Sequence, residues 1–63
     1  MSQRNLSTII FDLKSQYKKT FGDKYINNPQ LELIVNSAAY EIKAGRYCKW
    51  VKNDKGFRFI KFY

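Results

Sequence analysis

The four residues Asn53-Asp54-Lys55-Gly56 constrain the fold more than any other stretch of the sequence. Asn at the first position of a type I turn and Gly at the fourth are typical of a three-residue hairpin loop that closes with a β-bulge. The residues on either side are rich in aromatic and β-branched types, which favour strands. The sequence therefore predicts an antiparallel β-hairpin over about residues 46–63.

The same turn decides which residues lie on each face of the hairpin, because it pairs Asn53 with Phe57. The face expected to pack on the rest of the chain holds Cys48, Trp50, Ile60 and Phe62. The face expected to be exposed holds Tyr47, Lys49, Val51, Phe57, Phe59, Lys61 and Tyr63. A four-residue loop is the alternative, but it would place Cys48 opposite Lys61 and mix charge into the apolar face. Since register follows the burial pattern, we prefer the bulged turn. It leaves Lys49 opposite Lys61, which is mildly unfavourable unless an anion lies over the pair.

A helix is predicted ahead of the hairpin over about residues 6–21. Asn5 or Ser7 can cap its start, and Gly22 is the expected stop. The apolar residues that follow helical spacing and should form its buried stripe are Leu6, Ile9, Ile10, Leu13, Tyr17 and Phe21. In the loop over residues 22–28, we expect Tyr25 and Ile26 to fold back over the core.

A second helix is predicted over about residues 29–44, with Asn28 as N-cap and Pro29 at its first position. Its apolar stripe consists of Leu31, Ile34, Val35, Ala38 and Ile42. Leu33 and Tyr40 lie nearly opposite that stripe, and a helix with two apolar faces is usually covered on both. We expect the second face to be covered either by the hairpin or by another subunit.

These elements predict a single small α+β domain over residues 1–63, with the order helix, helix, strand, strand. A chain this short buries a small core, and the single cysteine, Cys48, allows no internal disulfide. We therefore expect a homodimer. Pairing of residues 57–63 with their symmetry mate is one way to form it, and would give a four-stranded sheet and hide an edge.

The composition also bears on where the protein works. No apolar run reaches the length of a membrane span, so we expect a soluble protein with no membrane partner. The lone cysteine suits a reducing, intracellular setting, such as the cytoplasm of a bacterium, or of a host cell if the protein is viral. Phe, Tyr, Met, Ile, Asn and Lys, which AT-rich codons encode, make up 31 of the 63 residues. That tilt suits a low-GC bacterium, a phage or another virus.

Catalytic signatures are missing from the sequence. There is no histidine, which removes the commonest general base and the commonest metal ligand. The five carboxylates are scattered, and no Gly-rich phosphate loop occurs. We expect no enzyme activity, no metal and no cofactor.

The positive charge is concentrated in the hairpin segment. Of the formal net charge of +7, residues 43–63 carry +6 and residues 1–42 carry +1. Such a field attracts polyanions, most commonly phosphate backbones. Exposed aromatic rings can stack on unpaired bases, and a two-stranded ribbon also fits a DNA major groove.

The sequence therefore predicts a small basic accessory or regulatory protein that binds DNA or RNA. The predicted contact residues are Arg46, Tyr47, Lys49, Lys52, Lys55, Arg58, Phe59, Lys61 and Tyr63. Two alternatives stay open. The lysines and arginines can serve only to keep an aromatic hairpin soluble. The hairpin can also dock on an acidic protein, as in a phage- or plasmid-type modulator of a host protein.

Overall fold

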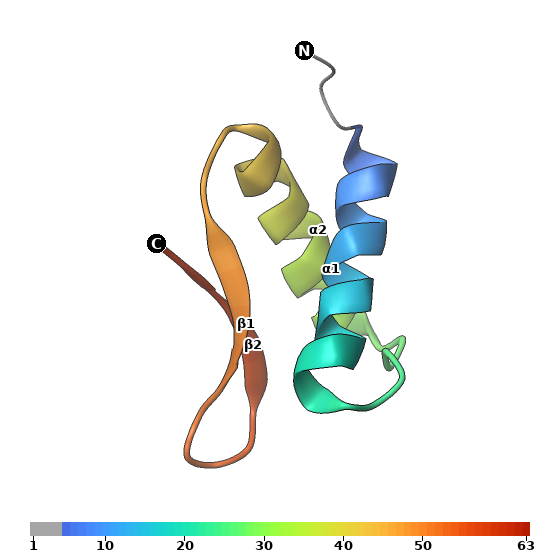
Figure 1. Ribbon diagram of the computed structural model, residues 1–63, viewed down its shortest axis with the longest axis vertical. Helices are drawn as coiled ribbons and strands as arrows, with labels where there is room; N and C mark the ends of the chain where they lie inside the picture. The colour runs from blue at the N-terminus through green and yellow to red at the C-terminus, as the bar shows by residue number, and fades with distance from the viewer. Residues whose placement is uncertain (1–4) are drawn as a thin grey trace.

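The computed structural model describes residues 5–63 and has two helices followed by a two-stranded antiparallel sheet (Figure 1). In chain order the elements are α1 (Leu6–Phe21), α2 (Pro29–Lys43), β1 (Cys48–Lys52) and β2 (Arg58–Phe62). The two helices pack on each other, and the hairpin lies beside the pair with its turn at the same end as the α1–α2 loop. The predicted α+β order of two helices and a C-terminal hairpin is confirmed.

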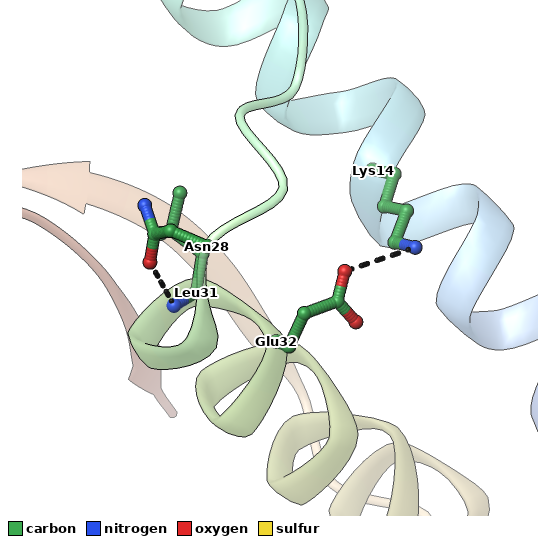
Figure 2. A network of polar contacts seen from close by, with 4 residues as sticks. All are labelled: Lys14, Asn28, Leu31 and Glu32. Atoms are coloured by element: carbon green, nitrogen blue, oxygen red, sulfur yellow. Dashed lines mark hydrogen bonds and ion pairs between the residues drawn. The ribbon is translucent and has the colours of Figure 1, made fainter.

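The helix ends follow the capping residues in the sequence. The Asn5 side chain accepts a hydrogen bond of 2.8 Å from the Thr8 N–H at the start of α1. At the start of α2, Asn28 accepts one of 2.9 Å from the Leu31 N–H (Figure 2). Gly22 ends α1 with a φ of 73°, a left-handed conformation that glycine adopts without steric cost. Each helix therefore begins with one of its unpaired N–H groups satisfied.

The loop between the helices is only partly buried. The Tyr25 ring packs on the core, 5.3 Å from the ring of Tyr17 and 5.1 Å from the ammonium of Lys14. Ile26, which was expected to cover the core as well, is instead 54% exposed. Its carbonyl accepts from the Asn28 N–H, so the chain is already turning into the α2 cap and points this side chain outward.

A polar contact joins the two helices near that loop. The Lys14 ammonium on α1 lies 3.3 Å from a Glu32 carboxylate oxygen on α2 (Figure 2). Burial, followed by the nearby charge of Glu32 and then by Tyr17, raises the pKa of Tyr25 to about 12. The Tyr25 hydroxyl is itself enclosed without a hydrogen-bond partner among residues 5–63. This phenol is therefore strongly held in its neutral form.

The core lies between the helices and one face of the hairpin. Its buried members are Ile9, Leu13, Tyr17, Leu31, Val35, Ala38, Ala39 and Trp50. Trp50 is the hairpin's contribution to this set, and its indole N–H donates a 2.8 Å hydrogen bond to the Leu13 carbonyl of α1. The indole also meets the Tyr17 ring edge-on at 5.0 Å. One side chain thus joins the hairpin to α1 by both packing and a hydrogen bond.

The register of the hairpin agrees with the bulged turn and excludes the four-residue loop. The paired residues are Cys48 with Phe62, Lys49 with Lys61, Trp50 with Ile60, Val51 with Phe59, and Lys52 with Arg58. The Gly56 N–H donates to the Asn53 carbonyl at 3.0 Å, and Gly56 has a φ of 89°. The Asn53 side chain also accepts from the N–H groups of Lys55 and Phe57. The turn is therefore fixed by its own residues.

The second apolar face of α2 is uncovered in a single copy of the chain. Leu33 is 67% exposed and Tyr40 is 65% exposed, so the expectation that the hairpin covers them is wrong. The hairpin packs instead toward the side of α2 that carries Ile34 and Ala38, and an open groove of about 310 Å³ lies between this side and β2. That another subunit covers Leu33 and Tyr40 remains a prediction.

Within residues 5–63, neither helix combines the length and the hydropathy that crossing a bilayer would require.

Candidate nucleic-acid interface

The outward side of the hairpin carries most of the exposed rings of the molecule, and we call it the aromatic–lysine face. It consists of Tyr47, Lys49, Val51, Phe57, Phe59, Lys61 and Tyr63. Tyr47 is 81% exposed, Tyr63 62% and Phe59 39%. These rings are exposed because side chains alternate along a strand, and the alternate positions of both strands are used against the helices. The predicted division into a core-facing and an exposed side is confirmed.

Two lysines and one tyrosine form a compact group on this face. The ammonium groups of Lys49 and Lys61 lie 5.3 Å and 5.7 Å from the centroid of the Tyr63 ring. The electron-rich face of the ring attracts both cations and offsets the repulsion between two lysines that sit directly opposite each other. Within residues 5–63 neither ammonium forms an ion pair. Two positive charges are therefore held side by side and accessible.

The turn adds two further accessible cations to this end of the hairpin. Lys52 ends β1 on the core-facing side of the ribbon, and Lys55 lies in the turn itself. Both side chains are exposed, and neither has an ion-pair partner within the described part of the chain. They surround the hairpin tip with positive charge but do not lie among the rings.

The two arginines predicted to contact nucleic acid are occupied by contacts within the chain. Arg46 donates to the Glu41 carboxylate at 3.1 Å, and its guanidinium lies 5.5 Å from the Phe62 ring. Since Phe62 belongs to the core-facing side, Arg46 lies away from the aromatic–lysine face. The structure therefore separates Arg46 from the exposed rings.

Arg58 is held even more firmly, also on the core-facing side. Its guanidinium donates to the Tyr17 hydroxyl at 2.6 Å, lies 2.8 Å from an Asp23 oxygen and sits 4.7 Å from the Phe21 ring centroid. The hydrogen bond to Tyr17, and then the one to Asp23, raises the pKa of Arg58 above its ordinary value. Arg58 thus ties the start of β2 to the end of α1.

A groove that the sequence did not indicate lies next to the turn. It has a volume of about 370 Å³ and is lined by residues from the α1–α2 loop, the first turn of α2 and the hairpin tip, including Ile26, Phe57 and Arg58. Segments far apart in the sequence form it, and the sequence predicts that Ile26 covers the core and not that it lines a groove. We found no sequence pattern that would have revealed this groove.

Metal-binding and thiol chemistry would depend on the carboxylates and on Cys48. In residues 5–63 no three side chains of the His, Cys, Asp or Glu types gather into a possible metal site. Cys48 is half-buried on the core-facing side of β1, and burial raises the pKa of its thiol. A thiol with a raised pKa is a poor nucleophile, because the thiolate is the reactive form.

Comparison with known proteins adds no relative: no family model, no curated protein and no solved structure matches this chain.

Proposed function

We propose that this protein binds nucleic acid through the aromatic–lysine face, as a small non-enzymatic accessory or regulatory protein. One observation carries the proposal. Three exposed rings, Tyr47, Phe59 and Tyr63, share a face with two accessible lysines that have no carboxylate partner among residues 5–63. Rings of this kind stack on bases, and ammonium groups follow the phosphate backbone.

The distribution of charge supports a polyanionic ligand. Residues 43–63 carry six of the seven net positive charges, and two of their cations, Arg46 and Arg58, are paired with Glu41 of α2 and Asp23 of the α1–α2 loop. The remaining lysines of the hairpin, Lys49, Lys52, Lys55 and Lys61, are exposed around one ribbon. A field of this sign raises the local concentration of phosphate-bearing partners.

A binding assay with charge-reversed variants tests the proposal. Fluorescence anisotropy with labelled DNA and RNA is measured at about 50 mM salt and again at higher salt, where the affinity of the wild-type protein is expected to fall steeply. Lys49→Glu combined with Lys61→Glu is expected to weaken binding roughly tenfold or more and to reduce the salt slope by about two.

The matched control for this pair lies on α1. Lys18→Glu combined with Lys19→Glu makes the same change in net charge at two exposed positions on another element. It is expected to weaken binding far less than the hairpin pair. Equal losses from both pairs would show that net charge, and not the aromatic–lysine face, decides binding.

An acidic protein is the second candidate partner, and the open edges of the hairpin favour it. Asn53 with Phe57 and Tyr47 with Tyr63 are joined by backbone hydrogen bonds. The alternation of an antiparallel ladder then turns the backbone groups of Arg58, Ile60 and Phe62 away from β1. A strand with acidic side chains could add to such an edge. Capture of one defined protein, without any nucleic-acid binding at low salt, would favour this candidate.

We also infer that the protein works as a homodimer, because Leu33 and Tyr40 are largely exposed on the outer side of α2. Large apolar groups on one helix face are typical of a surface that another copy covers. Sedimentation at high micromolar concentration is expected to give a dimer, and Leu33→Lys is expected to shift it toward monomer. A wild-type protein that stays monomeric at that concentration would contradict the inference.

A further inference from the structure

We propose that the aromatic–lysine face takes single-stranded rather than double-stranded nucleic acid, with little dependence on base sequence. The inference rests on the proposed function and names its substrate class. It follows from the order of side chains along the ribbon and from the side-chain types that this face lacks.

The side chains of the face follow one another as rungs of a ladder. Tyr47 pairs with Tyr63, Lys49 with Lys61 comes next, and Phe59 stands on the rung after that. Same-face residues are two apart, so successive rungs are separated by about 6.8 Å, and the two aromatic rungs by about 14 Å. A rung of positive charge therefore lies between two rungs of rings. An unpaired strand offers the matching alternation of bases, which stack, and phosphates, which bind cations.

Most of the groups that read base edges in a duplex are missing from this face. Readout in the major groove pairs Arg or Lys with guanine, Asn or Gln with adenine and acidic side chains with cytosine, and it also uses Ser and Thr. Of these types the aromatic–lysine face holds only lysine, at Lys49 and Lys61, and both ammonium groups lie over the Tyr63 ring. The guanidinium groups of Arg46 and Arg58 are held on the core-facing side by Glu41 and Asp23. The face therefore offers flexible ammonium donors and no planar side chain for bidentate base readout, so its donors suit phosphates better than base edges.

Exposed rings contribute to binding only when a base can lie flat on them. In a duplex, each base is already stacked between its neighbours and presents only its edge. Tyr47, at 81% exposed, and Tyr63, at 62%, have open surfaces that paired bases cannot cover. Since every base has a flat face, stacking tolerates sequence. The face also offers no fixed donor–acceptor pair for a 2′-hydroxyl, so DNA and RNA strands are expected to bind within a few-fold of each other.

Four labelled probes of twelve nucleotides or base pairs separate the contributions. They are oligothymidine, oligouridine, an abasic strand with the same phosphates, and a mixed-sequence duplex. At about 50 mM salt, both base-containing single strands are expected to bind at least tenfold more tightly than the abasic strand and the duplex. The abasic strand isolates the phosphate contribution, which the lysines supply.

Removal of two rings tests the same idea from the protein side. Tyr47→Leu combined with Tyr63→Leu keeps apolar strand-forming residues, and the hydrogen bond from the Tyr63 N–H to the Tyr47 carbonyl belongs to the backbone. Affinity for oligothymidine is expected to fall by about tenfold per ring, while affinity for the abasic strand stays within a few-fold. Fluorescence of the buried Trp50 checks that the variant is folded.

The matched control removes one ring of similar exposure from another element. Phe11→Leu changes a side chain that is 69% exposed on α1 and lies outside the aromatic–lysine face. It is expected to leave the affinity for oligothymidine unchanged, whereas Tyr63→Leu alone, at a ring that is 62% exposed, is expected to lower it about tenfold. An equal loss from both single variants would overturn the inference.

The probes also separate failure of this inference from failure of the proposed function. Duplex binding as tight as single-strand binding overturns the inference and leaves nucleic-acid binding standing. Equal affinity for the abasic strand and oligothymidine overturns it as well, because phosphates alone would then account for binding. Absence of binding to every probe at low salt overturns the proposed function itself.

Discussion

The two faces of the hairpin both carry aromatic and basic residues, and these residues are used in opposite ways. On the core-facing side, Trp50 donates to Leu13, and Arg58 contacts both Tyr17 and Asp23. On the aromatic–lysine face, rings and ammonium groups contact mainly one another. The role of an aromatic or basic residue in the hairpin therefore cannot be assigned from its residue type alone. The position in the two-residue alternation separates Trp50 and Arg58, which hold the fold, from the exposed side chains opposite them. Lys52 is the exception, because it lies on the core-facing side and is still exposed.

The largest expected difference between the faces lies at their aromatic residues. Trp50→Ala removes a buried ring and its hydrogen bond and is expected to cost about 3–5 kcal/mol of unfolding free energy. Tyr47→Ala, on the opposite face, is expected to stay within about 0.5 kcal/mol. Urea unfolding followed by far-ultraviolet circular dichroism measures both, and Trp50→Phe supplies a milder variant if the alanine protein does not fold. Similar losses of unfolding free energy at the two positions would show that the two faces do not differ in their contribution to stability.

The basic residues provide the next contrast. Arg58→Gln removes a charge that bonds to Tyr17 and Asp23, whereas Lys61→Gln removes one that lies over the Tyr63 ring and has no ion-pair partner among residues 5–63. The Arg58 variant is expected to unfold at a clearly lower urea concentration than wild type, and the Lys61 variant at nearly the same concentration. An unchanged midpoint for Arg58→Gln would show that its contacts do not stabilise the fold.

The half-buried thiol of Cys48, on the core-facing side, is expected to make the stability of the fold depend on pH. Burial raises the pKa of Cys48, so the folded chain holds this proton more tightly than the unfolded chain. The resulting stability is fully present below the unfolded-state pKa and is lost as pH rises through the folded-state pKa. Between about pH 8 and pH 11, wild type is therefore expected to lose more stability than Cys48→Ala. Parallel unfolding curves for the two proteins over this range would contradict the prediction.

The smallest effect is expected where the two lysines meet. Lys49→Ala combined with Lys61→Ala removes a like-charge pair and also two cation–π contacts to Tyr63. These changes oppose each other, so the unfolding free energy is expected to shift by about 0.5 kcal/mol or less. Thermal unfolding at low and high salt measures it. A large loss of stability would mean that this face supports the fold and is not reserved for a partner.

The division of the hairpin into a core-facing side and the aromatic–lysine face could largely be predicted from the sequence, because its determinants are local. The Asn53–Gly56 turn sets the register, and the Asn28–Pro29 pair sets the start of α2, in each case through bonds that span a few residues. The exposed face then follows from alternation alone. These features depend on backbone geometry that neighbouring residues determine by themselves.

The partners of individual side chains could not be predicted in the same way. Arg58 was grouped with the exposed cations because alternation assigns a side chain to a face without naming what it will meet there. Its actual partner, Tyr17, lies 41 residues earlier in the chain. The exposure of Ile26 likewise depends on how the loop approaches α2. The exposure of Leu33 and Tyr40 depends on which side of α2 the hairpin packs against. Each of these outcomes is decided by long-range packing.

The ladder of the hairpin also determines how quickly its amides exchange with solvent. The bonds at both ends of the ribbon, Asn53 with Phe57 and Tyr47 with Tyr63, place the N–H groups of odd-numbered residues inside the ladder. In a sheet of two strands, the N–H of Trp50 then points away from β2, even though its side chain is among the most buried in the molecule. Deuterium is therefore expected to enter Trp50 faster than Val51, its neighbour with the more exposed side chain. Packing of a side chain and protection of its amide are separate properties in a ribbon this narrow.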